Sequence, residues 1–169
     1  MDLVQYRGIG FQQAGWLASL PFFGAFGGVI CSGLFSDFML RRGLSLSIAR
    51  KTPIVAGLLL STTIIGANYS RTPGWTITFM GLGFFGNGLA SITWSLISTV
   101  APKPLIGLTG GVFNFMGNMA SVTVPLIIGA LVRGGDFSLG LTYISGLALI
   151  GALAYILMVG KIERLQPCV

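Results

Sequence analysis

The chain has 169 residues, of which 53% are hydrophobic and only 8% are charged, and its mean hydropathy is +0.86. Soluble domains carry about a quarter charged residues, so this composition excludes a globular protein surrounded by water. The net charge of +6 does not indicate nucleic-acid binding, because the basic residues lie in short clusters between apolar runs, and two cysteines without any histidine exclude the usual zinc-site spacings.

Five segments are long and apolar enough to cross a hydrocarbon core about 30 Å thick, a distance that takes about 20 helical residues. We expect them to be helical throughout, because lipid offers no partner to a free backbone N–H or C=O group. Pro21 and Pro125 predict a kink or local unwinding in two of them. The sequence therefore predicts an all-α integral membrane protein with a lead-in at 1–13, transmembrane segments at about 14–36, 47–69, 75–97, 107–132 and 138–160, and a tail at 161–169.

The distribution of Lys and Arg predicts how the chain is oriented. Seven basic residues fall in the tail and the connections on one side, and three fall on the other. The first group is Arg41, Arg42, Arg50, Lys51, Lys103, Lys161 and Arg164, and the second is Arg7, Arg71 and Arg133. The positive-inside rule places the C-terminus in the cytoplasm and the N-terminus outside. Since five spans that start outside without a signal peptide are unusual, we expect the chain to be the C-terminal portion of a longer protein.

The end of the first span carries a motif with defined spacing, Gly33-Leu-Phe-Ser-Asp37-Phe-Met-Leu-Arg41-Arg42-Gly43. The Asp37 carboxylate can pair with Arg41 or Arg42, or accept hydrogen bonds from the N-terminal end of a neighbouring helix. The pattern resembles the loop signature of the major facilitator superfamily, and the resemblance implies that these residues form a cytoplasmic latch that stabilises one access state. A plain positive-inside loop with a single Asp is the alternative.

Further runs along the chain extend this resemblance: 50–62, 84–88, 110–118 and 159–164. They are similar to the anion:cation symporters of the superfamily, above all to bacterial sugar-acid transporters of the glucarate, galactarate and galactonate type. The resemblance covers nearly the whole chain and departs from the family at Met1-Asp2. It implies that the five spans correspond to helices eight to twelve of a twelve-helix carrier in the bacterial inner membrane. It also implies proton-coupled symport of hexonate or hexarate anions.

Polar side chains recur at helical spacing on two of the expected spans. One stripe consists of Asn87, Ser91, Trp94, Ser95 and Ser98, and the other of Asn114, Asn118 and Ser121. Polar groups at membrane depth need a partner, which can be another helix, water or a polar solute. The family resemblance implies that Ser91, Thr93, Trp94 and Asn114 contact the substrate, with Asn87 and Asn118 as secondary candidates. Helix–helix hydrogen bonding, and for Trp94 a place in the interfacial aromatic belt, are the alternatives.

No charged residue lies near the middle of any expected span. A proton-coupled anion carrier needs a titrating group and a cationic partner there, so we expect both in an N-terminal half, and we expect no transport by this chain alone. No cofactor or enzymatic function is expected, because the sequence offers no histidine and no nucleophile beside a base. A half-size protein that assembles with a partner chain, and a membrane subunit without transport activity, remain alternatives.

Overall fold

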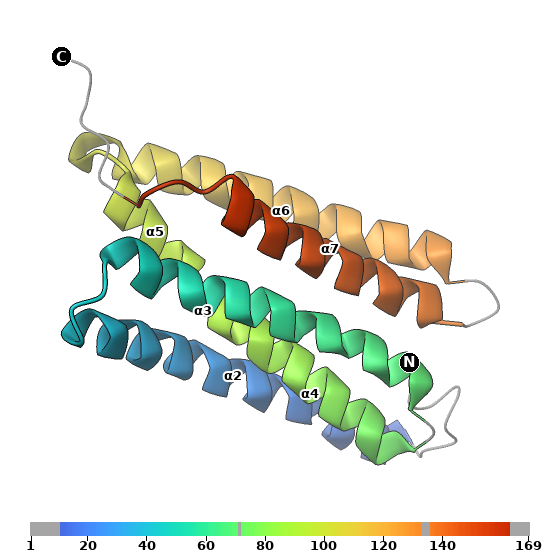
Figure 1. Ribbon diagram of the computed structural model, residues 1–169. Coiled ribbons are helices and arrows are strands. Elements are labelled where there is room, and N and C mark those ends of the chain that lie inside the picture. Colours follow the sequence, from blue (N-terminus) through green and yellow to red (C-terminus); the bar gives the residue numbers. More distant parts are fainter. Residues whose placement is uncertain (1–10, 71, 133–135, 163–169) are drawn as a thin grey trace.

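The computed structural model describes residues 11–70, 72–132 and 136–162, and almost all of these residues are helical. The predicted all-α class is therefore confirmed. Figure 1 labels the α-helices. With the 3-10 helices written as η, the elements in chain order are α2 (Phe11–Arg41), α3 (Leu46–Ser61), η1 (Thr62–Tyr69), α4 (Pro73–Ala90), α5 (Thr93–Val100), η2 (Lys103–Leu105), α6 (Ile106–Leu131) and α7 (Ser138–Leu157).

Four helical stretches have the length and apolar composition that a membrane crossing requires: Ser19–Arg41, Leu46–Tyr69, Lys103–Leu131 and Ser138–Leu157. Successive long helices run in opposite directions (Figure 1). The described Lys and Arg residues therefore gather at one end of the bundle, beside the α2–α3 turn, the α5–α6 connection and the end of α7. They are Arg41, Arg42, Arg50, Lys51, Lys103 and Lys161. The four remaining arginines, Arg7, Arg71, Arg133 and Arg164, lie outside the described residues.

Helix α2 is longer than the first expected span at both ends. It begins at Phe11, inside the expected lead-in, and it ends at Arg41 instead of 36. Residues 1–10 of that lead-in and residues 163–169 of the tail lie outside the described residues. Each proline was expected to cause a kink or local unwinding. Helix α2 continues through Pro21 and α6 continues through Pro125, so neither helix is unwound at its proline.

The turn after α2 is set by Gly43, whose φ is +81°. The Gly43 N–H donates to the Leu40 carbonyl at 3.0 Å, and the Leu44 N–H donates to the Met39 carbonyl at 3.2 Å. This pair of bonds is the Schellman motif, which satisfies carbonyls at a helix C-terminus and favours glycine at the left-handed position. Ser45 then caps α3, since its hydroxyl oxygen accepts from the Ile48 N–H at 3.4 Å.

The second expected span is helical throughout but changes its winding. The first part is the α-helix α3, and from Thr62 onward the chain forms the 3-10 helix η1. The Thr62 and Thr63 hydroxyls donate to carbonyls three residues back, on Leu59 at 2.6 Å and on Leu60 at 2.7 Å. Such side-chain bonds compete with the α-helical pattern and favour tighter turns.

The third expected span, 75–97, is not one continuous helix. Helix α4 ends at Ala90, Ser91 and Ile92 form a turn, and α5 begins at Thr93. Through this turn the backbone bonds join residues three apart, with Ser91 N–H donating to Gly88, Trp94 N–H to Ser91 and Ser95 N–H to Ile92. The Thr93 and Ser95 hydroxyls also donate to carbonyls three residues back, at 2.8 and 2.7 Å. Hydroxyl side chains that compete for backbone carbonyls explain the interruption.

Glycines bring α4 into direct backbone contact with two neighbours. An added Cβ on Gly57 of α3 would overlap the Gly86 carbonyl oxygen, and one on Gly28 of α2 would overlap the carbonyl oxygen of Phe85. The Ser61 hydroxyl reinforces the α3–α4 contact through a bond to Gly83 O at 3.0 Å, which it makes in addition to a bond to Gly57 O of its own helix at 2.9 Å. Small residues that let backbones approach closely are the usual means of packing helices in lipid.

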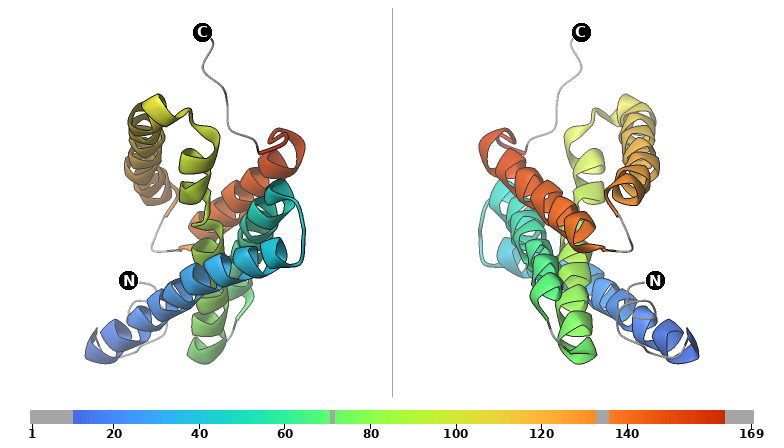
Figure 2. Two further views of the ribbon diagram at one scale, coloured as in Figure 1. Left: turned by 90° about the vertical axis from the view of Figure 1, so that its left-hand side faces the viewer. Right: turned by 90° about the vertical axis from the view of Figure 1, so that its right-hand side faces the viewer.

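Helix α6 stands to one side of the bundle (Figure 2). It has no buried residue, and it makes few contacts with α5 and α7. By contrast, α7 packs on α3 and η1, where the Asn68 amide donates to the Ser138 carbonyl at 3.0 Å and the Ser145 hydroxyl donates to the Thr62 carbonyl at 3.2 Å. The chain thus has a packed group, α2 to α4 with α7, and a loosely attached helix, α6.

Candidate functional site

A pocket of about 440 Å³ lies beside the turn between α4 and α5. Its volume is within the range of small-molecule sites. One wall comes from α2, through Ala25 and Val29. The other comes from the end of α4 and the start of α5, through Asn87, Gly88, Ala90, Ser91, Thr93 and Trp94. The interrupted helix therefore places four of the six candidate residues around one space.

Three polar groups of this pocket have no protein partner within the described part of the chain. They are the Asn87 amide, the Ser91 hydroxyl and the Trp94 indole N–H. Asn87 and Trp94 are exposed, with 54% of Trp94 accessible, and Ser91 is half-buried. Together they offer N–H and O–H donors and two oxygen acceptors, which suit a solute that carries several hydroxyls and a carboxylate.

Thr93 differs from the other three because its hydroxyl is already engaged. It donates to the Ala90 carbonyl at 2.8 Å and accepts from the Tyr155 phenol of α7 at 3.3 Å. Its side chain thus holds the first turn of α5 in place and ties it to α7. No sequence pattern pointed to Tyr155, which lies 62 residues away along the chain and joins the site only through tertiary packing.

The remaining two candidates, Asn114 and Asn118, do not line this pocket. Both are exposed on α6, where the Asn118 amide donates to the Asn114 side-chain oxygen at 2.7 Å and to its backbone carbonyl at 2.9 Å. Their link to the pocket is indirect. The Trp94 and Phe113 rings meet edge to face with centroids 5.0 Å apart, which sets α6 against the start of α5.

The structure places the five candidate latch residues at the end of α2. Gly33 and Asp37 lie within the helix, Arg41 is its last residue, and Arg42 and Gly43 form the turn. Within the described ranges the exposed Asp37 carboxylate forms no ion pair with either arginine. The Arg42 guanidinium instead lies over the Phe38 ring, 4.3 Å from its centroid, in a cation–π contact.

A helical membrane bundle with a polar pocket at a broken helix is the construction that secondary transporters use for their solute sites. The chain is 55% identical to the D-galactonate transporter of Escherichia coli O6:H1 (strain CFT073) over 162 residues, which cover 96% of this chain and 38% of that protein. It is 43% identical to the probable galactarate/D-glucarate transporter GarP of E. coli K12, over 97% of this chain and 37% of the relative. The probable galactarate/D-glucarate transporter GudP of Bacillus subtilis 168 is also 43% identical, with 96% and 36% covered.

Over nearly its whole length the chain is thus similar to bacterial transporters named for galactonate, galactarate and glucarate, which is the resemblance that its motifs indicated. It spans little more than a third of the length of these curated relatives. No family model matches the chain. The relatives are transporters and not enzymes. Together with the four long apolar helical stretches, they support a multi-pass membrane protein.

Proposed function

We propose that this chain forms part of a carrier for sugar-acid anions of the hexonate or hexarate class. The observation that supports the proposal most directly is a set of three polar groups around one pocket, on Asn87, Ser91 and Trp94, that have no partner among the described residues. A hexonate carries hydroxyls along its whole length, so several of them can bond to this wall at once. The names of the relatives, which are galactonate and galactarate/glucarate transporters, favour the same substrate class.

The start of α5 favours an anionic solute. Its first residues, Thr93 and Trp94, line the pocket, where the Trp94 indole N–H and the nearby Asn87 amide are donors from which a carboxylate can accept hydrogen bonds. Such hydrogen bonds are weak beside the attraction of a full cation, and the described Lys and Arg residues lie at the end of the bundle. We therefore assign the cationic partner and the proton-coupling group to an N-terminal half, with which this chain would form a proton symporter.

Asn114 and Asn118 complete the proposed site only when α6 moves toward α5. Carriers of this kind expose a central site alternately to the two sides through rearrangement of helix groups. In the proposed cycle Asp37, Arg41 and Arg42 form the cytoplasmic latch, with Gly33 and Gly43 setting the geometry of the helix end and the turn. The latch ion pairs would then belong to a conformation other than the one described here.

The proposed topology has five crossings of a bacterial inner membrane, at about 14–36, 47–69, 75–97, 107–132 and 138–160, with the 1–13 lead-in outside and the tail from 161 in the cytoplasm. The cluster of basic residues at one end of the bundle supports this orientation. The third crossing would consist of α4 and α5 joined by the Ser91–Ile92 turn.

The test is a chimera in which this chain replaces the matching segment of the E. coli D-galactonate transporter. Cells that lack endogenous sugar-acid uptake would express the chimera, the chain alone, or the transporter without that segment, and labelled galactonate uptake would be measured. We expect uptake from the chimera only. A correctly inserted chimera without uptake would count against the proposed carrier function. Uptake by the chain alone would favour the half-size alternative, in which the exposed surface of α6 is covered by a second copy or a partner chain.

A further inference from the structure

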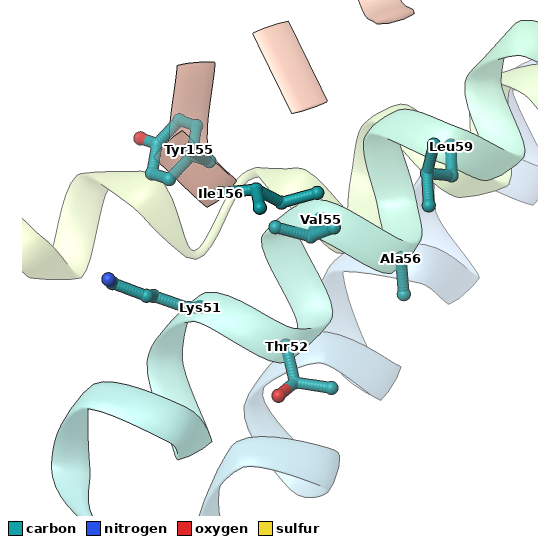
Figure 3. Close-up of a pocket in the computed structure, with 7 residues that line it drawn as sticks. All are labelled: Lys51, Thr52, Val55, Ala56, Leu59, Tyr155 and Ile156. Atoms are coloured by element: carbon teal, nitrogen blue, oxygen red, sulfur yellow. The ribbon is translucent and has the colours of Figure 1, made fainter. Parts of the chain in front are cut away.

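A groove of about 380 Å³ lies between α3 and α7 (Figure 3). It shares no lining residue with the pocket at the α4–α5 turn. Its lining consists of one cation, one threonine and a run of apolar or aromatic side chains: Lys51, Thr52, Val55, Ala56, Leu59, Tyr155 and Ile156. In Figure 3 Lys51 lies at one end of the α3 wall and Leu59 at the other, while Ile156 of α7 lies next to Val55 and Tyr155 lies toward the Lys51 end.

The groove extends along α3 for most of the depth of one membrane leaflet. From Lys51 to Leu59 the helix advances eight residues, which at the α-helical rise is about 12 Å. Half of the hydrocarbon core is roughly 15 Å. Leu59 and Ile156 keep 44% and 54% of their surface exposed, and Ala56 is exposed as well, so the wall remains accessible from the side of the bundle. An acyl chain that lies along α3 would cover it.

The charged end of the groove lies where a lipid headgroup would sit. The Lys51 ammonium donates to the Val159 carbonyl just beyond α7 and retains two further N–H donors. The Ile162 N–H donates to the Ser47 hydroxyl at 2.8 Å, which brings the neighbouring Lys161 to the first turn of α3. Within the described ranges the one acidic residue at this end of the bundle is Asp37, on α2.

The geometry points to a binding site for one anionic phospholipid, with its phosphate at Lys51 and one acyl chain along the wall between α3 and α7. A sugar acid does not fit this groove, because it is polar along its length and would leave the apolar wall uncovered. A zwitterionic phospholipid has the same chains, but its headgroup also carries a positive charge. A lysine near the membrane surface supplies about a fivefold preference for an anionic headgroup.

The experiment uses the full chain, purified in detergent, with native mass spectrometry to count retained lipid. The probes are phosphatidylglycerol, phosphatidylcholine with the same acyl chains, and oleate, each added at increasing concentration. Lys51→Gln removes the charge and Lys51→Arg keeps it, while Ala56→Trp fills the groove and leaves Lys51 in place. The matched controls are Lys103→Gln, at the same end of the bundle, and Leu108→Trp, on the exposed surface of α6. Circular dichroism verifies the helix content of every variant.

We expect one phosphatidylglycerol per chain, held about fivefold more tightly than phosphatidylcholine. Lys51→Gln should abolish that preference, and Ala56→Trp should remove both lipids, while Lys51→Arg and both control variants bind as the unmodified chain does. Equal retention of the two phospholipids by the unmodified chain would overturn the inference. So would stronger binding of oleate than of phosphatidylglycerol, or equal losses for Lys51→Gln and Lys103→Gln.

Discussion

The phenol of Tyr155 donates a hydrogen bond to the hydroxyl of Thr93, with the two oxygens 3.3 Å apart. The Thr93 hydroxyl in turn donates to the Ala90 carbonyl. The two bonds together link α7 to the first residue of α5 and to the last residue of α4. Thr93 also lines the pocket. Tyr155 therefore acts as a positioning residue for the proposed substrate site without lining it.

Replacing Tyr155 with Phe should weaken substrate binding and leave the bundle folded. The variant loses one hydrogen bond that orients Thr93, which is typically worth about 0.5–1.5 kcal/mol, or about two- to tenfold in affinity. We expect KM for galactonate in the chimera to rise by that factor with little change in maximal uptake. Tyr143→Phe, on the same helix but away from the pocket, is the control. Equal KM values for the two variants would show that the phenol of Tyr155 has no positioning role.

Trp94 contributes a ring and an N–H donor, and two substitutions separate these contributions. Trp94→Phe retains an aromatic ring against Phe113 but removes the donor, whereas Trp94→Ala removes both. We expect about a tenfold rise in KM for the first variant, because a polar solute group loses its partner, and a larger loss for the second. Uptake kinetics of the chimera measure this, with Trp75→Phe as the control because Trp75 lies at the start of α4, away from the pocket. If only the alanine variant lost uptake, the Trp94 ring would matter for packing against Phe113 and its N–H would have no part in substrate binding.

The contact between α3 and α4 should not tolerate a methyl group. In Gly57→Ala the new Cβ meets the Gly86 carbonyl oxygen and the Ala90 backbone nitrogen, so the helices must separate. We expect a loss of about 1–3 kcal/mol, the usual cost of overpacking. Gly146→Ala is the matched control within α7, because an added Cβ there meets nothing within 4 Å, and it should be neutral or slightly stabilising. The unfolding temperature in detergent measures both, and similar values would contradict the close packing.

The connection before α7 makes a prediction about pH. The Ser138 N–H donates to the Asp136 carboxylate at 2.9 Å, and this bond lowers the pKa of Asp136 from its ordinary value of 3.8. Because the pKa is lower in the folded state than in the unfolded state, the bond makes its full contribution to the stability of the first turn of α7 above pH 3.8. That contribution is lost as the pH falls through the folded-state pKa. In a carbon NMR titration of the chain in micelles, the Asp136 carboxyl should titrate below pH 3.8 together with the Ser138 amide shift. The amide shift should stay flat in Asp136→Asn.

The all-helical class could be predicted because long apolar runs in lipid leave no alternative to the helix. The Gly43 turn could also be anticipated from a glycine that follows two arginines. The break at Ser91–Ile92 was not predicted, because hydropathy averaged over about twenty residues does not register hydroxyls that compete for backbone carbonyls. Asn114 was grouped with Ser91 from the family resemblance, but periodicity along one helix does not specify how closely α6 approaches α5.

The Ser91–Ile92 turn separates two parts of the chain that differ in how closely their helices pack: α4 before it, and α5 with α6 after it. Before it, the backbone of α4 is in direct contact with α2 and α3 at glycine residues. Beyond it, α5 and α6 are linked through the Trp94–Phe113 ring pair, and α6 has few other contacts within the chain. The Tyr155–Thr93 bond holds the first turn of α5 to α7, so the movement of α6 in the proposed cycle would leave the α4–α5 wall of the pocket in place. The pocket would then close through displacement of one loosely packed helix, without any change in the turn that shapes its wall.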